Sequence, residues 1–196
     1  MGQPLILASK SVTRQRLLSN AGIEFEVYDA GINEAAIKSC CKKENHLVAD
    51  TALKLARTKG SIVSTRFPNS LVISADQMLE QGKEWYSKPI SRDVARTQLK
   101  ALSGKTHKLV TACCIYIGKN EKWHNISVAN MKVRRLNDKF IENYIDEIGH
   151  DALISAGVYQ IEGKGINLFD SIDGDFFSIL GLPILPLLAF LRTFTV

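Results

Sequence analysis

Apolar and polar residues alternate along the chain with two different periods. Short apolar runs predict strands over residues 5–8, 25–28 and 70–76, and longer runs predict strands over 107–117 and 123–133. Apolar residues at helical spacing predict helices over 12–21, 46–60, 91–102 and 138–148, with Gly22 and Gly60 as stops. Helices and strands therefore alternate around two consecutive long strands, which predicts an α/β domain with a mixed sheet.

The remaining segments have weaker patterns. The stretch from Gly31 to Asn45 is polar and shows no clear period, and the glycine-rich stretches 155–169 and 172–183 indicate loop and strand. QGKEW (81–85) predicts a turn between two short strands, and Pro183 predicts the start of a closing helix. No repeat or linker divides the 196 residues, so the length suits a single domain over 1–196, either as one body or as two closely packed lobes.

Composition and charge exclude several classes of protein. The net charge of +5 could attract nucleic acid or a small polyanion, but the basic residues are spread along the chain, with short runs only at 42–43 and 134–135. We therefore expect no stable nucleic-acid partner. The apolar tail ILGLPILPLLAFL is too short to span a bilayer, so we expect no membrane partner.

The cysteines lie in two adjacent pairs, Cys40–Cys41 and Cys113–Cys114, and neither pair has the spacing of a zinc site. The second pair falls in a strand-like run, which favours buried core thiols, while a redox role of Cys40 and Cys41 stays open. The N-terminus shows no signal-peptide pattern. A cytoplasmic location is the resulting expectation.

The stretch LILASKSVTRQRLL (5–18) combines a strand, a Ser-x-Ser turn and a helix. This arrangement aims free backbone N–H groups and the hydroxyls of Ser9 and Ser11 at an anion. Ser11 can cap the helix, and Arg14 in its first turn can lean back toward the same anion. A phosphate would offset the unfavourable cation at the helix N-terminus. The alternative is a capped helix with solvated arginines.

Asp76 ends the apolar run SLVISAD and would lie beside the end of strand 5–8 if the two strands are parallel. An acid there could hold a divalent metal or activate water, or it could cap a helix. Lys59 and Lys88 could bind phosphate or belong to the ordinary surface. Glu162 lies between a strand and glycines. Its carboxylate could accept hydrogen bonds from the N–H groups along one edge of a ligand, or the residue could belong to a plain turn.

Two other patterns in the sequence do not indicate a functional site. LSGKTH (102–107) lacks the glycine that a Walker A loop needs, because Leu99 stands at that position, so Gly104 is better explained as a helix cap. The histidines show no metal-binding spacing and are interpreted as structural or solvated.

Seven stretches together, in order and spacing, resemble the signatures of the Maf family: LILASKSVTRQRLL, LKLARTKG, VISADQ, SKPIS, LSGKTH, SAGVYQIEGKG and GDFFSILGLPILPLL. The resemblance implies a cytoplasmic nucleoside triphosphate pyrophosphatase that is commonly homodimeric. It also implies the fold of the inosine triphosphatases (the Maf/Ham1 fold), an elongated mixed sheet flanked by helices in two lobes around a nucleotide cleft. The Ser-x-Ser-x-x-Arg turn is closer to Maf than to its sister group.

The resemblance also implies roles for single residues. Asp76 would be the catalytic acid and, with Glu34, would bind a divalent cation, Mg²⁺ or Mn²⁺. The triphosphate would be bound by Ser9, Ser11, Arg14, Lys59 and Lys88. Water would attack the α-phosphorus and pyrophosphate would leave, which makes the protein a hydrolase acting on acid anhydrides, a house-cleaning activity in nucleotide metabolism.

The positions that select the base in the family are Thr13, Gln77 and Glu162 here. The thymidine and uridine triphosphate group has Arg, Thr and Gln, so all three differ, whereas the 7-methylguanosine triphosphate group has Trp, Gln and Glu, so two agree. A carboxylate at 162 suits the paired donors of guanine, but Thr13 lacks an aromatic face for a cationic base. We expect a guanine-type or modified purine triphosphate.

Other functions are weighed against this one. A nucleotide-binding regulator with little turnover is one alternative, because the family is also associated with septum formation and cell division. The presence of Asp76, Glu34 and Lys88 argues against a dead enzyme. An inosine or xanthosine triphosphatase is the nearest enzymatic alternative, and a substrate panel separates the two.

Overall fold

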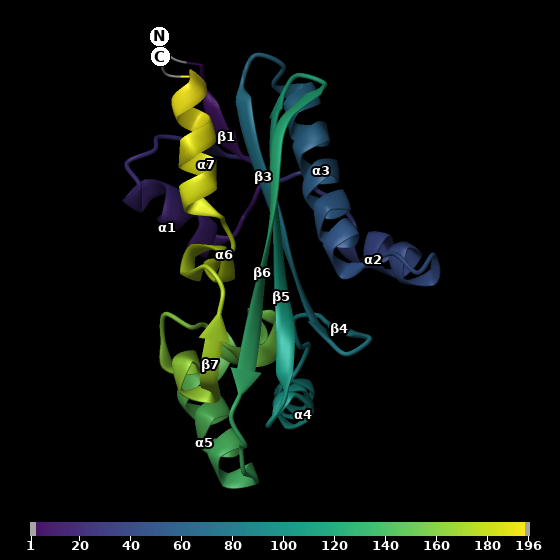
Figure 1. The fold of residues 1–196 in the computed structure, drawn as a ribbon, viewed down its shortest axis with the longest axis vertical. Helices are drawn as coiled ribbons and strands as arrows, with labels where there is room; N and C mark the ends of the chain where they lie inside the picture. The colour runs from purple at the N-terminus through teal and green to yellow at the C-terminus, as the bar shows by residue number, and fades with distance from the viewer. Residues whose placement is uncertain (1–2, 195–196) are drawn as a thin grey trace. The chain divides into compact units, whose positions relative to one another are not determined.

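The computed structural model describes residues 3–194, and within this range one mixed sheet of seven strands forms (Figure 1). Strand order is β2-β1-β3-β5-β6-β7, with β4 paired to β3. β1 runs parallel to β2 and β3, whereas β4 is antiparallel to β3 and β7 to β6. The strands are β1 (Leu5–Leu7), β2 (Glu26–Val27), β3 (Leu71–Gln81), β4 (Glu84–Tyr86), β5 (Thr106–Ile117), β6 (Asn120–Val133) and β7 (Phe169–Asp173).

Helices flank the sheet, which confirms the predicted α/β class with a mixed sheet. They are α1 (Val12–Asn20), α2 (Glu34–Lys43), α3 (Val48–Arg66), α4 (Arg92–Leu102), α5 (Asp138–Ile148), α6 (Phe176–Leu180) and α7 (Ile184–Leu191). Short 3₁₀ turns cover Gly149–Leu153, Ala156–Val158, Lys164–Leu168 and Arg192–Phe194. Across residues 3–194, no helix has both the length and the apolarity that a membrane crossing requires.

The chain divides into two compact units. Unit 1 contains the residues up to Gln77, Val110–Ser127 and the residues from Asp175 onward, and unit 2 contains Met78–Leu109 and Val128–Gly174. Strands β3, β5 and β6 each contribute one part to each unit. A single domain over 1–196, with two lobes around a cleft, stays a prediction.

The sheet of unit 1 is covered on both faces. Figure 1 shows α1 and α7 on one side of β3 and β5, with α3 on the other side. Because side chains alternate along a strand, Ile73 and Ala75 of β3 face α1 and α7, while Ser74 and Asp76 face α3. One hydrophobic core cluster of unit 1 contains Leu7, Leu17, Leu18, Leu71, Ile73, Ala75, Cys113, Ile115, Leu182, Ile184 and Leu187.

Three of the four cysteines are buried. Cys113 and Cys114 on β5 and Cys41 on α2 are fully enclosed, while Cys40 on α2 is exposed. Burial raises the pKa of Cys114 to about 12 and that of Cys113 further, so both stay protonated thiols. The prediction that this pair provides core thiols is confirmed.

In unit 2, α4 and α5 pack against each other. Each helix begins at the N-cap residue that the sequence predicts. Ser91 caps α4 and Asn137 caps α5 through their side-chain oxygens. His107 is buried and its Nε2 lies 2.7 Å from the Tyr159 hydroxyl. Burial lowers the pKa of His107 to about 4, so the ring is neutral near pH 7 and structural, as interpreted from the sequence.

Two predicted ends are wrong, because tertiary contacts outweigh local signals. α3 continues through Gly60 to Arg66, and a Cβ at Gly60 would lie 2.6 Å from Ser74 Oγ, so the glycine allows close packing rather than ending the helix. β3 continues through Asp76 to Gln81. The acid is accepted inside the strand because Lys59 pairs with it.

Two helices were not expected. α2 fills the polar stretch without apolar period; Asn33 caps it, Glu34 lies in its first turn and Lys42 and Lys43 lie in its last. These charges complement the helix dipole and stabilise the helix without a broad apolar face. α6 replaces the expected loop and strand over five residues, and Asp175 caps it. The predicted closing helix is confirmed, since Pro183 precedes α7.

Candidate active site

The turn between β1 and α1 has the predicted local geometry. The Ala8 N–H donates to the Ile73 carbonyl, so β1 ends beside β3 as expected for parallel strands. Ser9 Oγ accepts from the Ser11 N–H at 3.2 Å, and Ser11 Oγ accepts from the Arg14 N–H at 3.4 Å. Ser11 is therefore the N-cap, and the first turn of α1 contains no acidic residue. The helix leaves a partial positive charge at this end.

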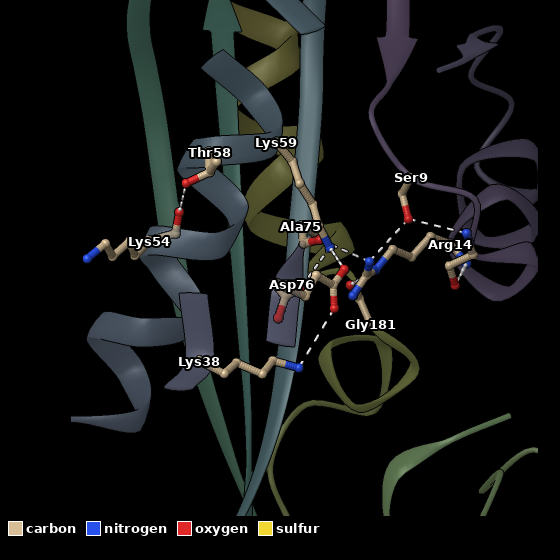
Figure 2. A network of polar contacts seen from close by, with 11 residues as sticks. Ser9, Arg14, Lys38, Lys54, Thr58, Lys59, Ala75, Asp76 and Gly181 are labelled. Atoms are coloured by element: carbon tan, nitrogen blue, oxygen red, sulfur yellow. Dashed lines mark hydrogen bonds and ion pairs between the residues drawn. The ribbon is translucent and has the colours of Figure 1, made fainter. Parts of the chain in front are cut away.

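Arg14 is buried, with 9% of its surface exposed, so the alternative of solvated arginines is wrong for this residue. Its Nε donates to the Gly181 carbonyl at 2.9 Å, and its Nη1 donates to the Ala75 carbonyl at 2.9 Å and to Ser9 Oγ at 3.2 Å (Figure 2). Burial lowers the pKa of the guanidinium, although the charge of Asp76 opposes that shift. The group remains a fixed cation beside Ala75, in the middle of β3.

Lys59 joins the two carboxylates of the site. Its Nζ lies 2.6 Å from Asp76 Oδ1 and 2.6 Å from Glu34 Oε1, so α3 connects β3 with α2 at this point. Figure 2 shows the Lys59 ammonium and the Arg14 guanidinium converging beside Asp76. Asp76 is only 3% exposed, whereas Glu34 is partly open to solvent. Partial burial raises the pKa of Glu34, but the Lys59 hydrogen bond and charge outweigh it and the pKa is lowered.

The second oxygen of Asp76 is unusual. Oδ2 is buried, and no hydrogen-bond partner for it exists among residues 3–194. Leaving a buried acceptor unpaired costs about 1–3 kcal/mol, more when the group is charged, so this atom is a candidate position for a ligand contact.

A divalent cation fits this donor set. Mg²⁺ is commonly bound by one or two carboxylates together with substrate phosphates, and Asp76 and Glu34 provide two carboxylates. Within the part of the chain that the structure describes, no group of three or more His, Cys, Asp or Glu side chains could hold an ion.

Gln77 follows Asp76 and is fixed by its amide nitrogen. Nε2 donates to Thr111 Oγ1 at 2.8 Å and to the carbonyls of Ser178 and Ile179, each at 3.0 Å. All three partners are acceptors, so the atom facing them must be the amide nitrogen and not the amide oxygen. Residues of α6 and β5 therefore fix the orientation of the side chain. Gln77 is thus a rigid element of unit 1.

The other predicted residues lie in two places. Thr13 is half-buried on α1, in the same unit as Asp76 and Gln77. Lys88 and Glu162 belong to unit 2, where both are exposed; Lys88 follows β4, and Glu162 follows the buried Ile161. Unit 1 therefore brings together Ser9, Ser11, Arg14, Glu34, Lys59 and Asp76, and the roles of Lys88 and Glu162 stay predictions.

Comparison with known proteins identifies the family of this chain. A sequence model of the Maf family, described as Maf-like protein, matches residues 4–194. The chain belongs to the Maf family. It is 46% identical over 188 residues to the 7-methyl-GTP pyrophosphatase of Brucella abortus biovar 1 (strain 9-941), covering 96% of this chain and 94% of the relative. It is 46% identical over 191 residues to the nucleoside triphosphate pyrophosphatase of Nitrobacter hamburgensis (strain DSM 10229 / NCIMB 13809 / X14), covering 97% and 94%.

A third relative is the 7-methyl-GTP pyrophosphatase of Rhizobium meliloti (strain 1021), 45% identical over 188 residues and covering 96% of this Maf protein and 94% of the relative. Among solved structures, a HAM1 protein from Coxiella burnetii gives a TM-score of 0.43 at 12% identity, covering 68% of this chain and 74% of that one. That score is too low to support any argument. The predicted membership of the Maf family is confirmed by the sequence comparisons.

Sequence reasoning missed two contacts made by the predicted residues of this Maf protein. Lys38 lies 3.7 Å from Glu34 Oε2 on α2, and the four-residue spacing would have indicated the pair if a helix had been expected there. The Gly181 carbonyl, which accepts from Arg14, is 167 residues away in the chain, and no local pattern predicts that contact.

Proposed function

We propose that this Maf protein hydrolyses a nucleoside triphosphate to the monophosphate and pyrophosphate, with a guanine-type base preferred. The reaction class agrees with the names of its relatives, which are 7-methyl-GTP and nucleoside triphosphate pyrophosphatases. The single observation that carries the proposal is the cluster of Arg14, Lys59, Asp76 and Glu34 beside the N-terminus of α1. The buried cations Arg14 and Lys59 suit the binding of a polyanion. The buried, unpaired oxygen of Asp76 suits a role as proton acceptor.

The cations of unit 1 would bind and orient the phosphates. The start of α1 offers backbone N–H groups and a partial positive charge, and Arg14 adds a fixed cation on the same side. Arg14 spends three of its hydrogen bonds on the protein itself, so its position is determined before substrate arrives. Preorganised charge of this kind stabilises a leaving pyrophosphate without reorganisation during the reaction.

Asp76 would act on the attacking water. Its Oδ1 is occupied by Lys59 and its Oδ2 has no partner among the described residues, so Oδ2 is the atom that would accept the proton. The water oxygen bonds to the α-phosphorus, the bond to the bridging oxygen breaks, and pyrophosphate leaves with that oxygen. Bound Mg²⁺ or Mn²⁺, held by Asp76 and Glu34, would lower the pKa of the water and screen phosphate charge.

The base preference rests on Gln77 and Glu162. Both residue types agree with the 7-methylguanosine triphosphate group, and two relatives carry that activity in their names. Glu162 offers two acceptor oxygens, which suit the N1–H and the 2-amino group of guanine. Inosine lacks the amino group, so the carboxylate favours guanosine over inosine. Thr13 supplies no aromatic face, and this departs from the same group.

A divalent metal, a homodimeric state and a cytoplasmic location complete the proposal, as the family resemblance implies. Each has a direct measurement: chelation by EDTA should abolish turnover and Mg²⁺ or Mn²⁺ should restore it. Light scattering of the purified chain should give twice the 21.7 kDa of one copy. A fluorescent fusion in the source cell should be distributed through the cytoplasm.

The decisive experiment measures pyrophosphate release from GTP, 7-methyl-GTP, ITP, XTP, UTP and dTTP. Asp76→Asn should lower kcat by at least about a hundredfold, since general-base catalysis contributes about 10²–10⁴. Asp170→Asn, an exposed carboxylate on β7, is the matched control and should leave kcat unchanged. Wild type that binds nucleotides but turns over none of them would refute the enzyme and favour a nucleotide-binding regulator.

The same panel tests the base preference. Glu162→Gln keeps the size of the side chain but presents an N–H₂ group where guanine has donors, so the GTP-to-ITP ratio of kcat/KM should fall about tenfold. An unchanged ratio would remove Glu162 from base selection. Equal or better use of ITP and XTP by wild type would favour the inosine and xanthosine triphosphatase alternative.

A further inference from the structure

One ammonium holds both carboxylates of the candidate metal site. Lys59 Nζ lies 2.6 Å from Asp76 Oδ1 and 2.6 Å from Glu34 Oε1 (Figure 2). The Lys59 side chain is 11% exposed and that of Asp76 is 5% exposed, so water screens this pair weakly. The two carboxylate oxygens come from different elements, β3 and α2, and share this lysine as their common partner.

The place that Lys59 occupies is the place that a shared cation would need. Mg²⁺ binds oxygen ligands at about 2.0–2.1 Å, and a metal bound to both of these oxygens must lie between them. The ammonium already lies between them, within hydrogen-bond distance of each. The Lys59 ammonium and a metal ion cannot occupy that volume at the same time, and the repulsion between the two charges would be strong at such short range.

We propose that Lys59 is a resident counter-cation, which keeps Asp76 and Glu34 together in the free protein and which a metal ion must displace. This inference rests on the proposed function in one respect, that Asp76 and Glu34 are the metal ligands. The displaced ammonium, with its three donors, then pairs with phosphate oxygens of the substrate. Metal and triphosphate therefore bind cooperatively, because each removes an obstacle to the other.

The competing explanation is that Lys59 is a permanent structural partner and that the metal uses Asp76 Oδ2 with Lys59 still in place. The two explanations differ in what happens when the ammonium is removed. Displacement predicts that metal binding in the absence of nucleotide becomes tighter. A permanent partner predicts that it becomes weaker or stays the same, because the carboxylates lose the group that aligns them.

The test measures Mn²⁺ binding to the nucleotide-free protein by electron paramagnetic resonance of the free ion. Lys59→Met should bind Mn²⁺ at least about tenfold more tightly than wild type. Lys38→Met is the matched control: it removes a positive charge 3.7 Å from Glu34 Oε2 but bridges no second carboxylate, and should change the affinity by less than about threefold. Lys59→Arg keeps the cation and should behave as wild type.

A second readout needs no variant to fold. The Lys59 ammonium should give a ¹H–¹⁵N signal in wild type that shifts and saturates as Mg²⁺ is added. Tighter Mn²⁺ binding by Lys59→Met, or this shift where that variant fails to fold, supports the proposal. Unchanged or weaker binding by folded Lys59→Met, absence of Mn²⁺ binding by all four proteins, or an ammonium signal unmoved at saturating Mg²⁺ overturns it.

Neither readout measures hydrolysis, so the two proposals fail separately. A protein that releases Lys59 to Mg²⁺ but turns over no triphosphate would refute the proposed function alone. An active pyrophosphatase in which Lys59→Met gains no affinity for Mn²⁺ would refute displacement alone.

Discussion

Replacing Gly60 with alanine tests the close packing of α3 on the sheet, which sets Lys59 against Asp76. The added Cβ would lie 2.6 Å from Ser74 Oγ and 2.6 Å and 2.9 Å from ring carbons of Tyr116. Distances below 3.0 Å are essentially never observed for real Cβ atoms, so either these side chains or the helix must move. Lys59 precedes Gly60 directly and moves with the helix.

Two opposing contributions decide the magnitude. Alanine is favoured over glycine inside a helix by about 1 kcal/mol. Overpacking a close-packed contact costs about 1–3 kcal/mol, and the upper value applies here because the Tyr116 ring is tethered by its hydroxyl, which donates to Glu121 at 2.9 Å. The net loss should be about 2 kcal/mol, which lowers Tm by about 4–8 °C in a chain of this size. The displaced Lys59 should also reduce kcat/KM about tenfold.

The assays are thermal unfolding followed by circular dichroism and pyrophosphate release under the same conditions. Ser61→Ala, at the next and exposed position of α3, is the matched control and should raise stability by a few tenths of a kcal/mol. Adding Ser74→Ala to Gly60→Ala removes one of the close contacts and should recover part of the loss. A Gly60→Ala protein more stable than wild type by about 1 kcal/mol would refute the packing argument.

Other buried polar groups give three further expectations. Arg14→Met strips two backbone carbonyls of their donor and should lower the free energy of unfolding by about 3 kcal/mol in urea; a loss below 1 kcal/mol would contradict its structural role. His107 binds a proton more readily unfolded than folded, so wild type should lose about 2–3 kcal/mol relative to His107→Gln as pH falls from 6.5 to 4.5, and parallel pH curves would contradict this. Thr111→Val removes an acceptor of Gln77 and should lower the GTP-to-UTP ratio of kcat/KM; an unchanged ratio would separate Gln77 from base selection.

Local signals in the sequence were sufficient wherever neighbouring residues determine the structure. The N-cap role of Ser11 follows from its position between an apolar run and a helical period, and the structure confirms it. The apolar runs also place Asp76 on β3, beside the end of β1 on the condition that the two strands are parallel, and the structure shows them parallel. The type of fold and the turn that carries Ser9, Ser11 and Arg14 were therefore predictable, while phosphate binding by that turn stays a prediction.

Long-range packing set the rest. Glycine usually ends a helix, but Gly60 is required inside α3 because the helix lies so close to Ser74 and Tyr116. A charged residue usually ends a buried strand, but β3 continues past Asp76 because Lys59 neutralises it from another element. The pattern of residues along one segment does not say which distant segment packs against it. These two contacts could therefore not be predicted from the sequence.

The distribution of the cysteines makes the natural chain suitable for labelling at a single site. A maleimide reacts with the thiolate, and the raised pKa values of Cys113 and Cys114, together with their burial and that of Cys41, protect those residues. Cys40 is exposed, and its hydrogen bond to Glu44 raises its pKa, so mildly alkaline buffer favours its reaction. A fluorophore attached there would ride on α2, the helix that carries Glu34, and would report rearrangement of that helix during ligand binding without any engineered mutation.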